Sequence, residues 1–521
     1  MESLAAPSMA TLSEFKPQDI ANTAWSFANV GFKHEPLLAA ISECAIAKIE
    51  EFQPQDLGNT FWAFAKVEVM PDELLKTAVS TACPRRMSEP EPQNLAMTAW
   101  SFSTLGIVDE QLMSAIARRA VGRIAEFAIH DLSNLLWSYP ALELDAGCGL
   151  FGLARRLLAE RLPADSAAVI EKLAARTVTT YVVAEVSEFT NSLLEFAWSF
   201  AFAGEDMVEV GDILRRSLLA IATVLDERCS WQSLLGPSSG AVPYGLGPGW
   251  GSEVPSIVLD LPGIVAVLKP PHWEVDARAG GSLPGESSGA PLFSSFLRKR
   301  FPREVHPLMH CNEQQFGIIH RLDAPSSGLI LAGKNFVGYY TLRWQQDTYE
   351  LGREYLVLCH GRMCWGPRVI NAKIKTSKAF PATSKVSDEG KPAWTQVEPI
   401  CILERTGSTQ EQFTLVAIII RTGRTHQIRV HLKHIGHPTV TDGKYTDQLT
   451  YNSDKEWCSR NFLHRHRLTF VDTDGLLREA VAALPKDLCE VLRGLRPADD
   501  GQSPGTMRRL REGWVPGAAL V

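Results

Sequence analysis

One aspartate, Asp323, stands alone between two apolar, strand-like runs in the segment His320–Ala332. The turn that holds it is built from Pro, Ser and Gly residues, and Arg321 lies two positions before it. A carboxylate in such a turn is too exposed for the core and poorly shaped for packing. The position therefore predicts a chemically active acid, although an aspartate in a turn is, taken alone, more often only a turn former.

A second segment, Arg421–His431, follows about a hundred residues later. A strand leads into Thr422-Gly423, and Thr425 is placed to N-cap a helix that ends at Gly436. Apolar residues at Ile428, Leu432 and Ile435 predict the buried face of this helix, so Gln427 and Arg429 are expected to leave that face near the helix start. Because a helix N-terminus attracts anions, this segment is suited to bind a loop carboxylate and a phosphodiester.

Metal chemistry is not favoured by the pattern of possible ligands. Four histidines cluster near this helix, but their spacing does not put three on one face (His426, His431, His434, His437). The ten cysteines are scattered singly without a Cys-x-x-Cys pair, which favours a reducing compartment over a structural zinc site. We therefore predict no metal.

The elements around these residues predict an α+β region. Two short apolar runs form a hairpin around Leu261-Pro262-Gly263, and a helix is expected over Phe336–Trp344. Further strands are expected at Ile318-Ile319, Leu329–Leu331, Tyr355–Leu358 and Phe413–Ile420. Residues 279–290, rich in Gly and Ser, indicate a flexible insertion. The pattern is typical of a large mixed sheet with helices.

In order and approximate spacing, these segments resemble the motifs of RluA-type pseudouridine synthases. The motifs concerned are Ile264–Pro271, His320–Lys334, Arg353–Leu358 with Gly361, Gly390–Ala393, Gly423–Asp442, Phe462-Leu463-His464 and Leu484-Pro485. The resemblance covers roughly residues 254–493, and its two main motifs are highly specific. It implies isomerisation of uridine to pseudouridine in RNA, with rRNA or tRNA as the expected substrate and without a cofactor.

The resemblance also implies roles for individual residues. Asp323 would act at the ribose–uracil junction as a nucleophile or as a base, Arg429 would keep it ionised, and Tyr355 would stack on the uracil. The residues expected to bind the substrate are Arg321, Arg424, His426 and Gln427. The alternative is an inactive RNA-binding or scaffold protein that retains the synthase-like domain.

The N-terminal half contains a repeat with a period near 37 residues. A Trp-x-Phe or Trp-x-Tyr pattern recurs at Trp25, Trp62, Trp100, Trp137 and, after a longer interval, Trp198. Such a period predicts a solenoid of paired helices. In the first unit, Pro17 opens a helix that Gly31 closes, and a second helix follows.

Aromatic residues that recur at one position of a helical repeat most often pack between repeats, so we expect the tryptophans in the core. On this interpretation Trp62→Ala would cost about 3–5 kcal/mol as a core truncation. Residues 11–204 resemble octotricopeptide and heptatricopeptide-like repeats, which implies binding of single-stranded RNA. A protein-docking scaffold is an equally strong alternative.

Charge divides the 521-residue chain, whose formal net charge is −7. Residues 1–250 carry 18 basic against 31 acidic residues, a net −13, and the remainder carries 34 against 28, a net +6. The basic half suits a polyanion, whereas the acidic half does not and leaves a protein partner open as the alternative.

The fold class we expect is multidomain, an all-α solenoid followed by an α+β domain with a mixed, largely antiparallel sheet. The predicted domains are a helical-repeat domain (1–232), a linker (233–253), a catalytic domain (254–493) and a tail (494–521). We expect a monomer without a membrane span. The first residues lack the basic start of a targeting peptide, although the repeat type is compatible with a chloroplast or mitochondrion.

Overall fold

The fold is that of a computed structural model, which describes residues 2–86, 91–175, 180–228, 253–275, 290–377, 383–405 and 411–498. All but one residue of the predicted linker, all but one residue of the 279–290 insertion and most of the predicted tail lie outside these ranges. The described chain divides into one unit of Met1–Val169 with Val183–Leu218 and a second of Ile170–Val182 with Leu219–Val521. The two are described separately, and the predicted domain limits remain predictions.

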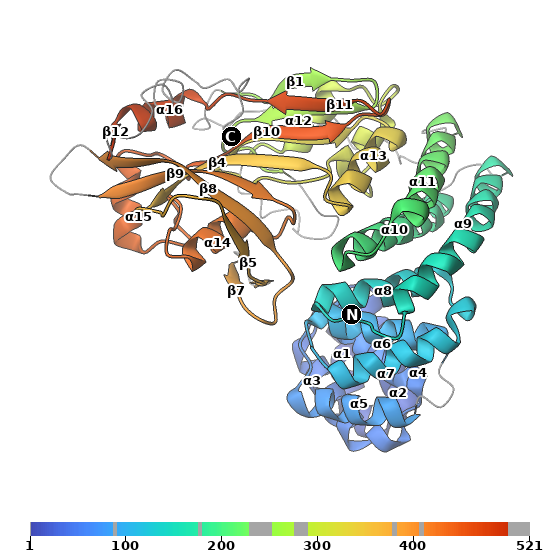
Figure 1. The fold of residues 1–521 in the computed structure, drawn as a ribbon. Helices are drawn as coiled ribbons and strands as arrows, with labels where there is room; N and C mark the ends of the chain where they lie inside the picture. Colours follow the sequence, from blue (N-terminus) through green and yellow to red (C-terminus); the bar gives the residue numbers. More distant parts are fainter. Residues whose placement is uncertain are drawn as a thin grey trace. The chain divides into compact units, whose positions relative to one another are not determined.

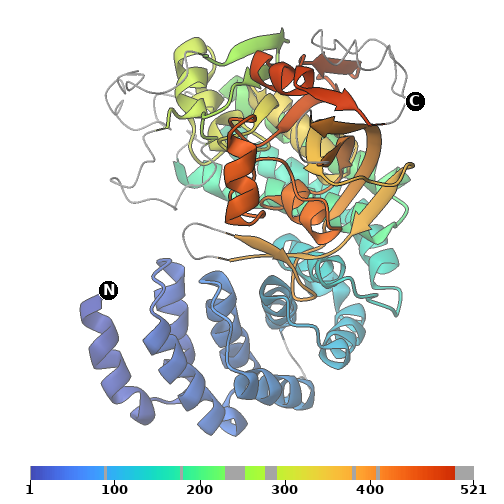
Figure 2. The same cartoon turned by 90° about the vertical axis from the view of Figure 1, so that its left-hand side faces the viewer.

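The N-terminal region is entirely helical. After α1 (Glu2–Thr11), the helices alternate between two rows (Figures 1 and 2). The first row comprises α2 (Pro17–Asn29), α4 (Pro54–Lys66), α6 (Pro92–Leu105), α8 (Ile129–Leu142) and α10 (Thr180–Ala203). The second row comprises α3 (Glu35–Ala47), α5 (Glu73–Arg86), α7 (Glu110–Gly122), α9 (Leu150–Ala175) and α11 (Val208–Arg228). This confirms the predicted all-α region of paired helices. No described helix is long and apolar enough to span a membrane.

Local sequence explains where the first-row helices begin and end. Proline opens α2 and α4, where its missing N–H costs nothing. The Asp19 carboxylate accepts a hydrogen bond from the Lys16 N–H at 3.2 Å, and Asp56 accepts one from the Gln53 N–H at 3.0 Å. Gly31 follows α2 with a φ of +68°, in the left-handed region that glycine tolerates best.

The repeated aromatic pair divides into a buried and a partly exposed member. The residue two positions after each tryptophan is buried (Phe27, Phe64, Phe102, Tyr139, Phe200). Trp25, in contrast, is 41% exposed, and the other four tryptophans are only partly buried. The expectation of an aromatic core between repeats therefore holds in part: the second aromatic of each pair is buried, whereas the tryptophans pack against one another between neighbouring helices but stay partly exposed.

This division changes the expected effects of substitutions. Phe102 is fully buried and stacks on Phe61 with ring centroids 5.1 Å apart, so Phe102→Ala should lower the free energy of unfolding by about 3–5 kcal/mol. Trp25→Ala, the control at the exposed position of the first repeat, should cost less than about 1 kcal/mol because this residue is already 41% exposed. Chemical denaturation of both variants measures this difference, and equal losses would contradict the assignment.

The C-terminal region is built on one large sheet (Figure 1). Its strands follow the order β1-β2-β3-β10-β4-β9-β8-β12, with β11 paired to β10 and β5 paired to β8. β3 and β10 run parallel and the other pairs are antiparallel. The expected mixed, largely antiparallel sheet is confirmed.

The described strands form this sheet and a separate two-stranded sheet of β6 and β7. They are β1 (Ser256–Asp260), β2 (Ile264–Lys269), β3 (Ser327–Gly333), β4 (Gly352–His360), β5 (Arg368–Asn371), β6 (Ile374–Thr376), β7 (Ser384–Val386), β8 (Trp394–Arg405), β9 (Gln412–Ile420), β10 (Leu463–Val471), β11 (Leu477–Val481) and β12 (Leu495–Pro497). The helices are α12 (Phe293–Arg300), α13 (Phe336–Asp347), α14 (Gln427–His434), α15 (Gln448–Lys455) and α16 (Lys486–Arg493).

Most of the elements expected here are present. The β1–β2 hairpin, the strands β3, β4 and β9, and helix α13 agree with the predicted segments. Ile318-Ile319 does not form a strand, since Ile318 makes only an isolated bridge to Ala332. β12 lies within the segment predicted as a tail and pairs with β8.

The central strand β4 alternates between the two faces of the sheet. Tyr355 and Val357 belong to the core cluster that includes residues of α12 and α14. Leu356 and Leu358 belong to the cluster that includes residues of α16. This alternation is the ordinary period of a strand, and it brings Tyr355 to the face that carries α14.

Candidate active site

The loop that carries Asp323 is held by its backbone carbonyl groups. The Ser326 N–H donates to the Asp323 carbonyl at 3.0 Å and closes a turn. The next carbonyl, of Ala324, accepts from the His272 N–H at 2.7 Å and from the Lys269 ammonium at 3.2 Å. Arg460 donates to the Pro325 carbonyl at 3.2 Å. These hydrogen bonds hold the turn through its backbone. The Asp323 side chain is therefore not needed to hold the loop in place.

Lys269 is fully buried beneath this loop. Its Nζ also donates to the carbonyls of Pro270 at 3.0 Å and Trp273 at 2.9 Å, so three acceptors match its three N–H groups. Burial, together with the nearby charge of Arg460, lowers the pKa of Lys269 to about 7. Lys269 thus links the β1–β2 hairpin to the loop that carries Asp323.

Helix α14 begins differently from the expectation. The N-cap is His426 rather than Thr425, with a left-handed φ of 56°, and no side chain caps the helix. Gln427 does the fastening instead: its amide oxygen accepts from Thr422 Oγ1 at 2.8 Å and from the Arg424 N–H at 3.0 Å. Its amide nitrogen donates to the Trp394 carbonyl and to Thr395, each at 2.9 Å. The predicted N-cap of α14, Thr425, was wrong because the buried Gln427 amide holds the start of the helix instead of a capping side chain.

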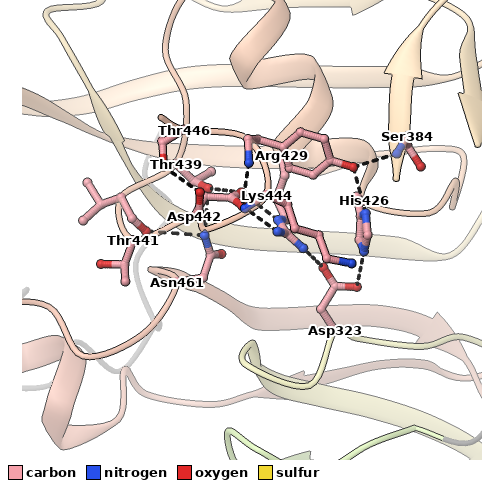
Figure 3. A network of polar contacts seen from close by, with 12 residues as sticks. Asp323, Ser384, His426, Arg429, Thr439, Thr441, Asp442, Lys444, Thr446 and Asn461 are labelled. Atoms are coloured by element: carbon pink, nitrogen blue, oxygen red, sulfur yellow. Dashed lines mark hydrogen bonds and ion pairs between the residues drawn. The ribbon is translucent and has the colours of Figure 1, made fainter. Parts of the chain in front are cut away.

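Arg429 joins two carboxylates (Figure 3). Its Nη1 donates to Asp323 Oδ2 at 2.7 Å, and its Nε and Nη2 donate to Asp442 Oδ2 and Oδ1 at 2.7 and 2.5 Å. Arg429 and Gln427 are buried, so the expectation that they leave the core face is wrong. The bidentate hydrogen bond to the buried Asp442 carboxylate fixes the plane of the guanidinium and directs its Nη1 at Asp323.

Asp442 is the fixed end of this chain of contacts. Its side chain is fully buried and also accepts from Thr439 Oγ1 at 2.9 Å and from the Lys444 N–H at 3.0 Å. Burial alone would raise the pKa of Asp442, but its hydrogen bonds and the charge of Arg429 outweigh that effect and lower it. Asp442 was noted in the sequence only as part of a motif, and no spacing rule pairs it with Arg429.

Electrostatics keep Asp323 ionised. Burial would raise the pKa of its carboxyl, but Arg429 outweighs this, with smaller contributions from His426 and Arg321, so the pKa lies below the usual value of an aspartate. The side chain remains 21% exposed. Since Oδ2 takes the hydrogen bond from Arg429, Oδ1 is the oxygen left for a reacting molecule.

His426 faces that oxygen without forming a true ion pair at neutral pH. Its Nε2 lies 3.9 Å from Asp323 Oδ1, and its Nδ1 lies 2.8 Å from the Tyr445 hydroxyl. Burial lowers the pKa of His426 to about 4, although Asp323 pulls it upward. The imidazole is therefore neutral near pH 7 and can offer a polar contact beside the carboxylate.

The other predicted binding residues fall into two kinds. Arg321 is exposed next to Asp323, and its charge helps to lower the pKa of that acid. Arg424 donates from Nε to the Pro392 carbonyl at 2.8 Å, and Gln427 is occupied as described. The structure brings Arg321 and His426 to Asp323, while Arg424 and Gln427 are engaged in holding the α14 start.

Tyr355 is buried on the same face of the sheet, where Leu322, the neighbour of Asp323, belongs to the same core cluster. Its hydroxyl accepts from Arg465 Nε at 2.9 Å, and the Arg465 guanidinium lies 4.9 Å from the ring centroid. Arg465 Nη1 also donates to His320 Nδ1 at 2.7 Å, and its Nη2 donates to the Arg321 carbonyl at 3.3 Å. Arg465 thus ties the phenol to the backbone that leads to Asp323.

Arg465 was missed in the sequence because it follows the motif Phe462-Leu463-His464 and looks like an ordinary strand arginine. Strand alternation could have flagged it, since Leu463 and Arg465 point to one face of β10 and Leu463 belongs to the core. β10 comes close to β3 here, and a Cβ at Gly328 (φ +129°) would lie 2.4 Å from the Arg465 carbonyl oxygen. Only glycine fits at that point.

On the activity expected from the sequence, replacing this arginine should slow turnover. In Arg465→Met the Tyr355 hydroxyl and His320 lose their donor, so we expect kcat to fall about 10- to 100-fold through misplacement of the phenol. Arg467→Met is the matched control, because Arg467 lies on the same strand but is half-exposed and paired with Glu479 at 2.8 Å. Single-turnover assays of the two variants decide: equal rates would mean that Arg465 does not position Tyr355.

Comparison with known proteins agrees with this geometry. Residues 264–434 match the family model described as RNA pseudouridylate synthase. YlyB of Bacillus subtilis, called an uncharacterized RNA pseudouridine synthase, is 35% identical over 181 residues, covering 34% of this chain and 56% of that protein. Ribosomal large subunit pseudouridine synthase D of Xylella fastidiosa is 31% identical over 191 residues, covering 34% and 55%. This part of the chain is therefore similar to the RNA pseudouridylate synthases.

Two further comparisons concern the rest of the chain and the fold. Residues 33–144 match a family model described as the N-terminal domain of Tbc2 translation factor. Among solved structures, human RNA pseudouridylate synthase domain containing 1 aligns with 22% identity over 51% of this chain and 97% of that one, with a TM-score of 0.37. The chain spans just over half the length of the two curated synthases named above.

Proposed function

We propose that this protein converts uridine to pseudouridine in RNA and that Asp323 is the essential acid. The observation that carries the proposal is the Asp323–Arg429–Asp442 chain, in which a buried carboxylate fixes a guanidinium that holds a second, partly exposed carboxylate ionised. The match of residues 264–434 to the synthase family supports the same assignment.

The reaction needs no redox partner. The C1′–N1 bond breaks, the uracil turns within the site, a C1′–C5 bond forms, the proton at C5 is released, and N1 takes up a proton, so that the product is an isomer of uridine. Asp323 Oδ1, the oxygen not bound to Arg429, acts either as the nucleophile on the sugar or as a base that removes a sugar proton. Both routes require an ionised carboxylate, and the charge of Arg429 maintains that state.

The residues around Asp323 position the target nucleotide and enclose its base. Tyr355 stacks on the uracil and assists removal of the C5 proton, with Arg465 holding its hydroxyl. Arg321 and His426 contact the flipped-out nucleotide from either side of Asp323. The contacts of Arg424 and Gln427 give less support to a substrate role, which stays a prediction for these two. Enclosure prevents escape of the base and attack by water.

The substrate is RNA, with rRNA or tRNA as the proposed class. The net charge of +6 on the residues after 250 favours a polyanion, and the helical region would select the RNA or a partner protein. The relative from Xylella fastidiosa is named for the large ribosomal subunit, which makes rRNA the first substrate to try.

Chemical mapping of pseudouridine tests the proposal against the alternative of an inactive scaffold. Carbodiimide-based or mass-sensitive mapping of RNA treated with the wild type and with Asp323→Ala should reveal sites present only with the wild type. Binding of RNA with identical maps for both proteins would favour the scaffold.

A further inference from the structure

The partly exposed tryptophans of the first-row helices recur at one repeat position, and four of them form two ring pairs. We call Trp25, Trp62, Trp100, Trp137 and Trp198 the tryptophan row. The Trp25 and Trp62 rings stack with centroids 6.2 Å apart, Trp137 and Trp198 lie 6.0 Å apart, and Phe202 stacks on Trp198 at 5.1 Å. The buried aromatic residue two positions later anchors each helix, so the row is not needed to fill the core.

One member of the row already binds a cation within the chain. The Lys66 ammonium lies 5.8 Å from the centroid of the Trp62 ring. The face of an indole ring carries negative potential and is the best aromatic partner for ammonium and guanidinium groups. The same kind of contact is open to a cationic partner at the other rings.

The helices that carry the row are acidic. They contain six carboxylates (Asp19, Asp56, Asp131, Glu185, Glu188, Glu195) against one basic residue, Lys66. Two of the acids lie between α8 and α10, the helices that carry the paired Trp137 and Trp198: Glu188 lies 3.8 Å from His130, and Glu195 accepts a hydrogen bond from Ser133 at 2.8 Å.

The arginines of this region lie on the second-row helices instead. Arg118 and Arg119 belong to α7, and Arg155, Arg156 and Arg161 belong to α9. A surface that combines indole rings with carboxylates and lacks arginine repels phosphate groups, because binding of nucleic acid depends on basic residues that neutralise them. Stacking of bases alone would have to overcome this repulsion.

We propose that the tryptophan row is a docking surface for an extended, lysine- and arginine-rich protein segment. Its cationic side chains lie over the indole faces and pair with carboxylates such as Glu188. The paired rings lie 6.0–6.2 Å apart, and an extended chain advances about 3.3 Å per residue with every second side chain on the same face, so a basic residue at every second position fits a ring pair. The proposal does not depend on the isomerase activity.

The test measures binding of a fluorescent peptide of about 15 residues, with arginine at every second position, to the full-length chain by anisotropy. A peptide with neutral citrulline at the same positions is the ligand control. Trp25→Ala and Glu188→Gln should each weaken binding about 3- to 10-fold, as expected for one cation–π or charge contact. Trp25 and Glu188 are both exposed, so these variants keep the fold.

Matched variants on the second row check that the effect is local. Leu74→Ala on α5 removes an exposed apolar side chain and Glu160→Gln on α9 removes an exposed carboxylate, and both should bind the peptide as the wild type does. Labelled oligouridine is measured in parallel. Failure of the arginine peptide to bind, equal binding of the citrulline peptide, or loss of oligouridine binding in Trp25→Ala and Glu188→Gln would each overturn the proposal, the last in favour of an RNA platform.

Discussion

Asp323→Asn should abolish pseudouridine formation, with a loss of about 10⁴-fold or more in the single-turnover rate. The amide keeps the shape of the side chain but cannot attack the sugar or take a proton from it, so both candidate routes stop. Losses of this size are typical when the reacting group itself is removed. The measurement is the rate of product formation with saturating protein and a fixed RNA substrate.

The same variant should remain folded and bind RNA. Asp442 still pairs with Arg429 in Asp323→Asn, so the buried guanidinium keeps a carboxylate partner. A melting temperature close to that of the wild type, together with unchanged RNA affinity, would separate lost chemistry from lost structure. Retention of even a hundredth of the wild-type rate would contradict a direct chemical role for Asp323.

Arg429→Met should be damaging in two ways. It leaves Asp442 as a fully buried carboxylate without its main partner, and breaking a buried ion pair from one side costs about 3–5 kcal/mol in the free energy of unfolding. It also removes the influence that holds the pKa of Asp323 down, so burial dominates and that pKa rises. The acid limb of the pH–rate profile should therefore move to higher pH, as measured on the folded fraction.

An exposed arginine–carboxylate pair provides the control for stability. Arg496 and Glu404 lie 3.3 Å apart with the arginine side chain 63% exposed, so Arg496→Met should change the free energy of unfolding by less than about 1 kcal/mol. Denaturant titration of both variants compares the two pairs. Similar small losses for Arg429→Met would show that the buried chain of contacts is not a structural unit.

The sequence predicted those parts of the site that depend on local signals. The turn around Asp323, the strand that carries Tyr355 and the helix that carries Arg429 follow from turn residues and apolar periodicity, and the structure places Asp323 and Arg429 2.7 Å apart. Their catalytic roles remain predictions.

Three features depend on tertiary packing and could not be predicted in the same way. Asp442 and Arg465 act through side chains that reach across elements, to Arg429 and to Tyr355. The start of α14 was misplaced because the Gln427 amide fastens it from inside the core. In the helical region, a period of 37 residues locates the tryptophans on one face but does not say whether that face is covered.

Release of hydrogen from C5 of uridine is the most direct measure of the central claim, because that proton leaves only when the base is reattached through carbon. With RNA carrying tritium at uridine C5, the wild type should release label into water in step with pseudouridine formation, and Asp323→Asn should release none. Release by Asp323→Asn at the wild-type rate, or no release by the wild type from total rRNA and tRNA, would contradict the account.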